Sequence, residues 1–261
     1  MIQAGVKIKA LLELKKSKNS KKEFKSGLEE LIINNIPSNL DAVEYGKQNN
    51  LIKNVLLLFN VQTILNNPKS QIRFPFDNYS TYSWDLEHIR SIKDDLPPKK
   101  DRKIWVEDVI HFLNTQGDRL AEKNEDEKQK LLKQLSKIMD DTSSEKFKTV
   151  YEDVLKFFNE DKEDEQTNSI GNLTLLDSKT NRSYKNAVFP VKRSRIIEND
   201  KSGSFVPICT KNVFLKFYSK KSKHLFLWEK DDIDDYADEI KETLSKYYLV
   251  INTPNNNDEE E

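Results

Sequence analysis

The sequence predicts a mostly α-helical protein with a small β element, an α+β fold in which helices interrupt the β element. Apolar residues recur three and four positions apart over residues 5–70, 105–159 and 231–250, the periodicity of amphipathic helices. Two short stretches, 79–89 and 169–176, have the compact aromatic and apolar pattern of strands. Because the second helical region separates these stretches, we expect the strands to pair across a long helical insertion.

Composition narrows the class of protein. The chain has 261 residues, enough for one large domain or two small ones, and its formal net charge is −1. Bulk charge therefore indicates no particular partner, and any nucleic-acid surface must be local. The single cysteine, Cys209, excludes an internal disulfide and a zinc–thiolate cluster, and fits a reducing compartment. Without a bilayer-length apolar run or a secretory signal, we expect a cytoplasmic protein with no membrane partner.

The residue pattern divides the first part of the chain into three segments. Residues 1–72 form a predicted N-terminal helical region. Residues 72–89 alternate aromatic and polar side chains around a proline, which predicts extended chain. Residues 93–103 contain paired prolines among charges, typical of an exposed loop.

The second half begins with the expected helical insertion at about 96–167. Its last part, the acidic run 160–168, is expected to be a solvated connector without function. The predicted C-terminal region, 201–261, contains a stretch at 205–220 that is ambiguous between strand and helix. An amphipathic helix and a disordered acidic tail should follow.

Four residues have side chains suited to phosphodiester chemistry: Glu87, His88, Asn172 and Asn181. A neutral imidazole can take a proton from water, and carboxylate and amide oxygens are ligands for hard divalent cations. Taken singly, each has an ordinary structural reading. His88 could be a surface histidine beside an acid, Asn172 a turn residue, and Asn181 a helix N-cap.

Together these residues resemble a known family. Glu87-His88-Ile89, then "IGNLTLL" at 170–176, then Asn181 resemble the HNH (His-Me finger, ββα-metal) nuclease motif. More specifically, they are similar to the C-terminal HNH domain of GmrSD-type modification-dependent restriction endonucleases, over about Leu51 to Tyr248. The resemblance implies an HNH core at 73–200, interrupted by the helical insertion.

The resemblance also implies roles for the residues. His88 would be the general base, and Asn172 would brace the loop and orient the His88 ring through a backbone contact. Glu87 and Asn181 would hold one divalent metal ion, with Mg²⁺ the expected ion and Mn²⁺ an acceptable substitute. Lys185, one helical turn beyond Asn181, would touch phosphate.

A basic stretch supports a surface that faces phosphates. Between Ser178 and Arg195 there are six basic residues and no acidic one, in a chain whose net charge is −1. They are Lys179, Arg182, Lys185, Lys192, Arg193 and Arg195. Such residues would give salt-dependent binding that is independent of base sequence. For Lys192 to Arg195, an ordinary solvated helix face is an equally good interpretation.

The predicted function is therefore metal-dependent DNA endonuclease activity in restriction of foreign or modified DNA, as in anti-phage defence. Family members usually begin with a ParB-like NTPase domain, so we expect a partner NTPase domain or subunit, or else a stand-alone nuclease. Two alternatives stay open: a non-catalytic or partner-dependent binding subunit with an HNH-like fold, and a ribonuclease that uses the same site. The remaining histidines, His111 and His224, are expected to be structural.

Overall fold

The computed structural model describes residues 6–69, 71–92, 96–116, 125–142, 145–161, 166–183, 186–221 and 224–249. The side chains of residues 181–183 and 249 are outside this description. The predicted disordered tail and Lys185 also lie outside the described residues.

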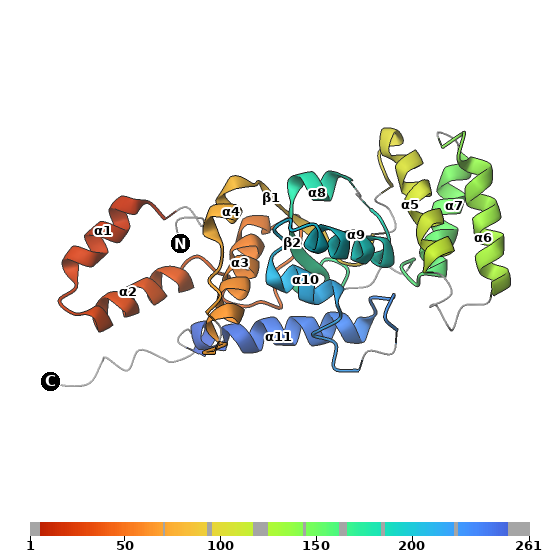
Figure 1. The fold of residues 1–261 in the computed structure, drawn as a ribbon. Helices are drawn as coiled ribbons and strands as arrows, with labels where there is room; N and C mark the ends of the chain where they lie inside the picture. Colours follow the sequence, from red (N-terminus) through yellow and green to blue (C-terminus); the bar gives the residue numbers. More distant parts are fainter. Residues whose placement is uncertain are drawn as a thin grey trace. The chain divides into compact units, whose positions relative to one another are not determined.

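The structure confirms a mostly helical chain with a small β element, a single two-stranded antiparallel sheet among the described residues (Figure 1). The chain forms two compact units. The first unit combines Met1–Phe74 with Ala237–Glu261, and the second comprises Pro75–Tyr236. The long helix α11 (Lys230–Leu249) begins in the second unit and ends in the first. None of the described helices has the length and apolarity needed to cross a membrane.

The first unit is built from helices. They are α1 (Ile8–Ser17), α2 (Lys21–Ile33), α3 (Asn49–Leu65) and the second half of α11. The apolar stripe of α3 is buried at Ile52, Val55 and Phe59. The Tyr247 hydroxyl of α11 bonds to the Gln62 side chain of α3 at 3.2 Å.

The second unit contains the sheet and the helix that follows it. Strand β1 (Trp84–His88) pairs with β2 (Leu173–Asp177), and β2 leads directly into the short helix α8 (Ser178–Ser183). The carbonyl of Ser83 accepts from the Ser178 N–H at 2.8 Å, which ties the start of α8 to the chain just before β1. Helix α8 contacts both strands. The result is a strand–strand–helix finger whose strands are far apart in sequence.

Between β1 and β2 in the sequence, the described residues form three α-helices. They are α5 (Arg102–Thr115), α6 (Glu125–Ile138) and α7 (Glu145–Phe157), labelled in Figure 1. Helix α6 packs against both of the others. The rings of Trp105, Phe147 and Tyr151 contact one another in the core of this group, with centroids 5.2–6.2 Å apart. The insertion thus has a hydrophobic core of its own.

Two helices cover the finger from later in the chain. Helix α9 (Phe189–Lys201) follows α8, and α10 (Ile208–Phe214) packs on β2 and α9. The ambiguous stretch at 205–220 is therefore helical at its centre. The Phe189 ring stacks on both Phe214 and Trp228, with centroids 5.6 Å apart in each case.

One local prediction is wrong. Residues 76–81, expected to be extended, form the short helix α4 (Phe76–Thr81). Pro75 precedes its first residue, and the Ser80 and Thr81 hydroxyls donate to the Asp77 carbonyl at 2.9 and 2.8 Å. The Tyr79 N–H also donates to the Pro75 carbonyl at 3.0 Å, so a helical backbone turn, and not pairing with another strand, satisfies this stretch.

Candidate functional site

Glu87 and His88 are the last two residues of β1, and both are almost completely buried. Glu87 pairs with Thr174 and His88 with Leu173 on β2. Cross-strand partners share a face of the sheet. On the Glu87 face, the Thr174 hydroxyl donates to Thr210 of α10 at 3.0 Å. Glu87 and His88, called the site dipeptide below, therefore lie where other elements cover the finger and are not a surface pair.

Asn172 fastens the chain immediately after His88. Its side-chain oxygen accepts from the Arg90 N–H, and its side-chain NH₂ donates to the Thr167 carbonyl, both at 2.9 Å. Its backbone carbonyl accepts from the Ile89 N–H, also at 2.9 Å. Asn172 is fully buried, so these bonds are protected from water. These bonds hold the loop of Asn172 against the backbone of residues 89 and 90. Orientation of the His88 ring by Asn172 stays a prediction.

The ring of His88 has a partner that sequence reasoning missed. Its Nε2 lies 3.2 Å from the Oδ1 of Asn168. Burial, assisted by the nearby Lys192 ammonium, lowers the pKa of His88 to about 4, against the opposing effect of the Asn168 hydrogen bond. The imidazole is therefore neutral at physiological pH and able to accept a proton. With Oδ1 as acceptor, Nε2 carries the hydrogen and Nδ1 has the lone pair.

Lys192 of α9 lies against the site dipeptide. Its Nζ is 2.7 Å from Glu87 Oε1 and donates to the His88 carbonyl at 2.6 Å. The lysine side chain is only 1% exposed. Such burial is at odds with the predicted phosphate contact of Lys192, because DNA cannot reach an enclosed ammonium without a rearrangement of α9.

Glu160 is a second buried acidic residue that interacts electrostatically with Lys192. It accepts from the Ser91 N–H at 2.8 Å and from the Phe189 N–H, at the start of α9, at 2.7 Å. Burial raises the pKa of Glu160, while Lys192 and the backbone hydrogen bonds oppose that rise. The carboxylate thus links the end of the insertion, the chain after β1 and helix α9.

The expectation of a solvated connector at 160–168 is wrong for this residue, because Glu160 is only 1% exposed. The sequence signal was Asn159 itself, since asparagine occurs at helix C-termini in the left-handed conformation. In the structure Asn159 has a φ of 57°, and the Glu160 N–H bonds back to the Leu155 carbonyl. The chain therefore reverses at Asn159 and returns Glu160 toward the core.

The predicted basic residues differ in their surroundings. Lys179 is exposed in the first turn of α8. The Arg193 guanidinium lies 5.4 Å from the centroid of the Phe226 ring, so it packs against the protein. Helix α8 carries Asn181 and Arg182 against the strand pair, but their side chains, like the whole of Lys185, lie outside the described residues.

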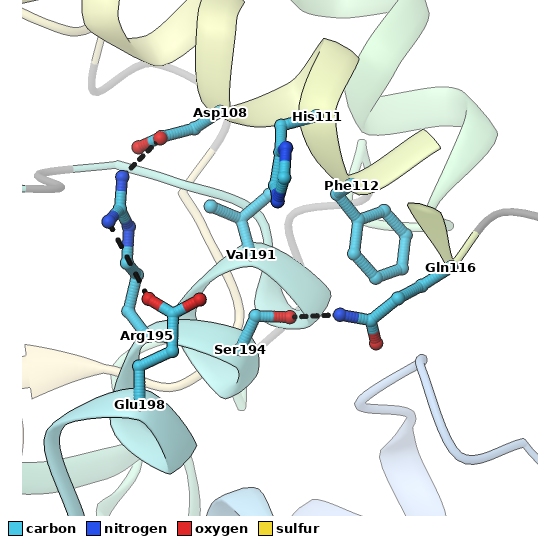
Figure 2. Close-up of a pocket in the computed structure, with 8 residues that line it drawn as sticks. All are labelled: Asp108, His111, Phe112, Gln116, Val191, Ser194, Arg195 and Glu198. Atoms are coloured by element: carbon cyan, nitrogen blue, oxygen red, sulfur yellow. Dashed lines mark hydrogen bonds and ion pairs between the residues drawn. The ribbon is translucent and has the colours of Figure 1, made fainter. Parts of the chain in front are cut away.

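The far side of α9 faces a separate pocket of about 270 Å³ between α5 and α9 (Figure 2). Arg195 makes ion pairs with Asp108 and Glu198 there, and Gln116 donates to the Ser194 hydroxyl at 3.1 Å. Burial raises the pKa of Asp108 against the opposing effect of Arg195. His111, expected to be structural, is exposed at this pocket. These contacts tie α9 to the insertion.

No group of three or more histidine, cysteine, aspartate and glutamate side chains among the described residues is arranged to hold a metal ion. A cation at this finger would therefore need an amide or a substrate oxygen beside Glu87.

Comparison with known proteins identifies the family. No curated protein and no solved structure matched the chain. The model of one protein family, described as GmrSD restriction endonucleases, C-terminal domain, matches residues 38–243. That match covers well over half of the chain and includes every site residue discussed above. The chain therefore belongs to the C-terminal domain family of the GmrSD restriction endonucleases, and its general activity is that of a nuclease.

Proposed function

We propose that this chain is an HNH-type, metal-dependent DNA endonuclease in which His88 is the general base. The observation that carries the proposal is the fastening of the His88 strand end by Asn172, through hydrogen bonds to the two residues that follow His88. Those bonds cross more than eighty residues of sequence. They join the end of β1, which carries Glu87 and His88, to the segment 171–173. Through β2 they also join it to α8, the helix that carries Asn181.

The protonation state of His88 supports its role. A base must be unprotonated before it can accept a proton, and burial keeps this imidazole neutral at pH 7. The Asn168 side chain lies 3.2 Å from Nε2 and would hold the ring in place while the imidazole takes a proton from an attacking water molecule. Asn172 acts on the backbone at this point and holds the strand end that carries the ring.

The donor atoms fit a hard divalent cation. Glu87 offers a carboxylate and Asn181 an amide oxygen, the ligand types that Mg²⁺ and Mn²⁺ share. Lys192 occupies Oε1 of Glu87, in keeping with the rule that metal-binding carboxylates are themselves hydrogen-bonded. When bound, the cation would stabilise negative charge on the phosphate and the leaving oxygen. Within the protein, Glu87 and Asn181 would hold it.

We assign the phosphate contacts to the basic residues at α8, of which Lys179 is exposed. Lys179, Arg182 and Lys185 belong to α8 or directly follow it, and the start of that helix is tied to β1. Arg193 packs on Phe226, so its part in DNA binding would be secondary. We further propose a role in restriction of foreign or modified DNA in the cytoplasm, with an NTPase domain or subunit as the partner.

A plasmid-nicking assay with Mg²⁺ or Mn²⁺ tests the catalytic proposal. His88→Ala should reduce cleavage at least ~100-fold, the usual minimum for loss of a general base. His111→Ala, at an exposed histidine of α5, is the matched control and should cleave like the wild type. Undiminished cleavage by a folded His88→Ala variant would refute the role of His88. A single-stranded RNA substrate in the same assay separates the DNA endonuclease from the ribonuclease alternative.

A further inference from the structure

Lys192 holds both parts of the site dipeptide at once. One ammonium group binds the Glu87 side chain at 2.7 Å and the backbone carbonyl of His88 at 2.6 Å. A phosphate ligand needs an accessible ammonium, and this one is enclosed, with 1% of its side chain exposed. The contacts of Lys192 therefore point inward, to the residues proposed to carry the chemistry.

The helix that carries Lys192 is fixed on two sides. Its first N–H, from Phe189, donates to Glu160 at 2.7 Å. Its outer face is tied to α5 by the Arg195–Asp108 ion pair and the Ser194–Gln116 hydrogen bond (Figure 2). A long side chain extended from a fixed helix can set the position of a strand end, because its own base has little freedom to move.

We propose that Lys192 is a positioning residue of the nuclease site, which fixes the Glu87 carboxylate and the His88 backbone from α9. This inference rests on the proposed function for its catalytic consequence only. Without the ammonium, Glu87 would be a buried carboxylate lacking its counter-ion. Such a group turns toward water, and that movement removes the orientation that a metal-binding carboxylate needs.

A second buried lysine provides a matched control. Lys216 also joins a carboxylate and a backbone carbonyl, with Nζ 2.5 Å from Asp232 Oδ2 and 2.7 Å from the Leu227 carbonyl. It belongs to the same compact unit, and its ammonium lies over the Phe189 and Trp228 rings and contacts neither Glu87 nor His88. Lys192→Met and Lys216→Met therefore remove the same kind of buried ion pair, one at the proposed site and one elsewhere.

The first measurement is steady-state cleavage at several salt concentrations. Lys192→Met should lower kcat about 10- to 100-fold, as loss of a group that orients a metal ligand does, and leave KM and the salt dependence of binding unchanged. Lys216→Met should retain kcat when folded. A raised KM with a shallower salt dependence would instead identify a phosphate contact and overturn the inference. Equal losses in the two variants would also overturn it, because both would then reflect general destabilisation.

The second measurement needs no activity, so it also decides the inference if the wild type fails to cleave DNA. The NMR signals of the His88 imidazole nitrogens and the Ile89 amide are recorded in metal-free protein. They should shift in Lys192→Met and not in Lys216→Met, whereas unchanged signals in folded Lys192→Met would refute the positioning role. Should Lys192→Met fail to fold, Glu87→Gln/Lys192→Met removes both charges of the pair. Its signals are then compared with those of Glu87→Gln, and a difference supports the inference while identity overturns it.

Discussion

The side-chain amide of Asn172 is hydrogen-bonded to the backbone of Arg90, 2.9 Å from oxygen to nitrogen, although 82 residues separate them in the chain. The same amide donates to Thr167. It thereby closes the long insertion at its base and fixes the direction in which the chain leaves His88.

Substitution of Asn172 should therefore affect both stability and cleavage. Asn172→Ala leaves the Arg90 N–H and the Thr167 carbonyl without these partners in a buried place, so the free energy of unfolding should fall by about 2–4 kcal/mol. Urea denaturation measures this loss. Asn60→Ala is the control, since Asn60 is a buried asparagine of α3 that bonds to Leu56 of its own helix. It should destabilise the protein without lowering nuclease activity in the folded fraction.

Glu160 should be as important as the motif residues for the integrity of the second unit. Glu160→Gln removes a charge that balances Lys192 and weakens two charge-assisted bonds, to the Ser91 and Phe189 N–H groups. We expect a loss of about 2–4 kcal/mol in unfolding free energy. Glu127→Gln, on the exposed surface of α6, should change stability by no more than about 0.5 kcal/mol. Equal effects of the two substitutions in thermal or urea unfolding would contradict this prediction.

Burial of His88 should make stability dependent on pH. Its pKa is about 4 in the folded protein, whereas an unfolded histidine titrates near 6.5. Between those values the unfolded state binds more protons, so unfolding free energy should fall as pH decreases from about 6.5 to 4, by up to about 3 kcal/mol. Urea denaturation in EDTA at several pH values measures this effect. A His88→Gln variant should lose less stability than the wild type over this range, and parallel curves for the two proteins would count against the buried neutral imidazole.

Lys179 should contribute to DNA binding and not to chemistry. Lys179→Ala should raise KM several-fold, leave kcat unchanged and reduce the slope of log affinity against log salt by about one, as expected for one lost phosphate contact. Filter binding over a range of NaCl concentrations gives the slope. Lys130→Ala, at an exposed lysine of α6, is the charge-matched control. An unchanged slope in Lys179→Ala would exclude this residue from the DNA surface.

Much of the architecture could be predicted from local pattern. The three- and four-residue apolar spacing located the helices around the strand pair, because burial of one helix face requires that spacing. The strands at the site were also recognisable, although only residues 84–88 and 173–177 are paired. Residues 76–81 were misassigned, because aromatic alternation does not show that the backbone of this stretch closes a helical turn onto Pro75.

The surroundings of the site were much harder to predict. Lys192 was grouped with surface cations and Glu160 with a solvated acidic run, yet both are buried and near each other. Asn168, inside the same acidic run, lies against the His88 ring. Composition alone could not separate these residues from their exposed neighbours, because charged side chains are nearly always exposed unless a partner is present.

The sequence by itself determined the helical class, the strand ends and the residue types that can hold a cation and accept a proton. Tertiary structure alone decided which charges surround them. Lys192 meets the His88 carbonyl across 104 positions, and Glu160 meets the Ser91 N–H across 69. The physical reason is that periodicity records which residues avoid water. It does not record which distant partner neutralises a buried charge, because that partner is adjacent only in the folded protein.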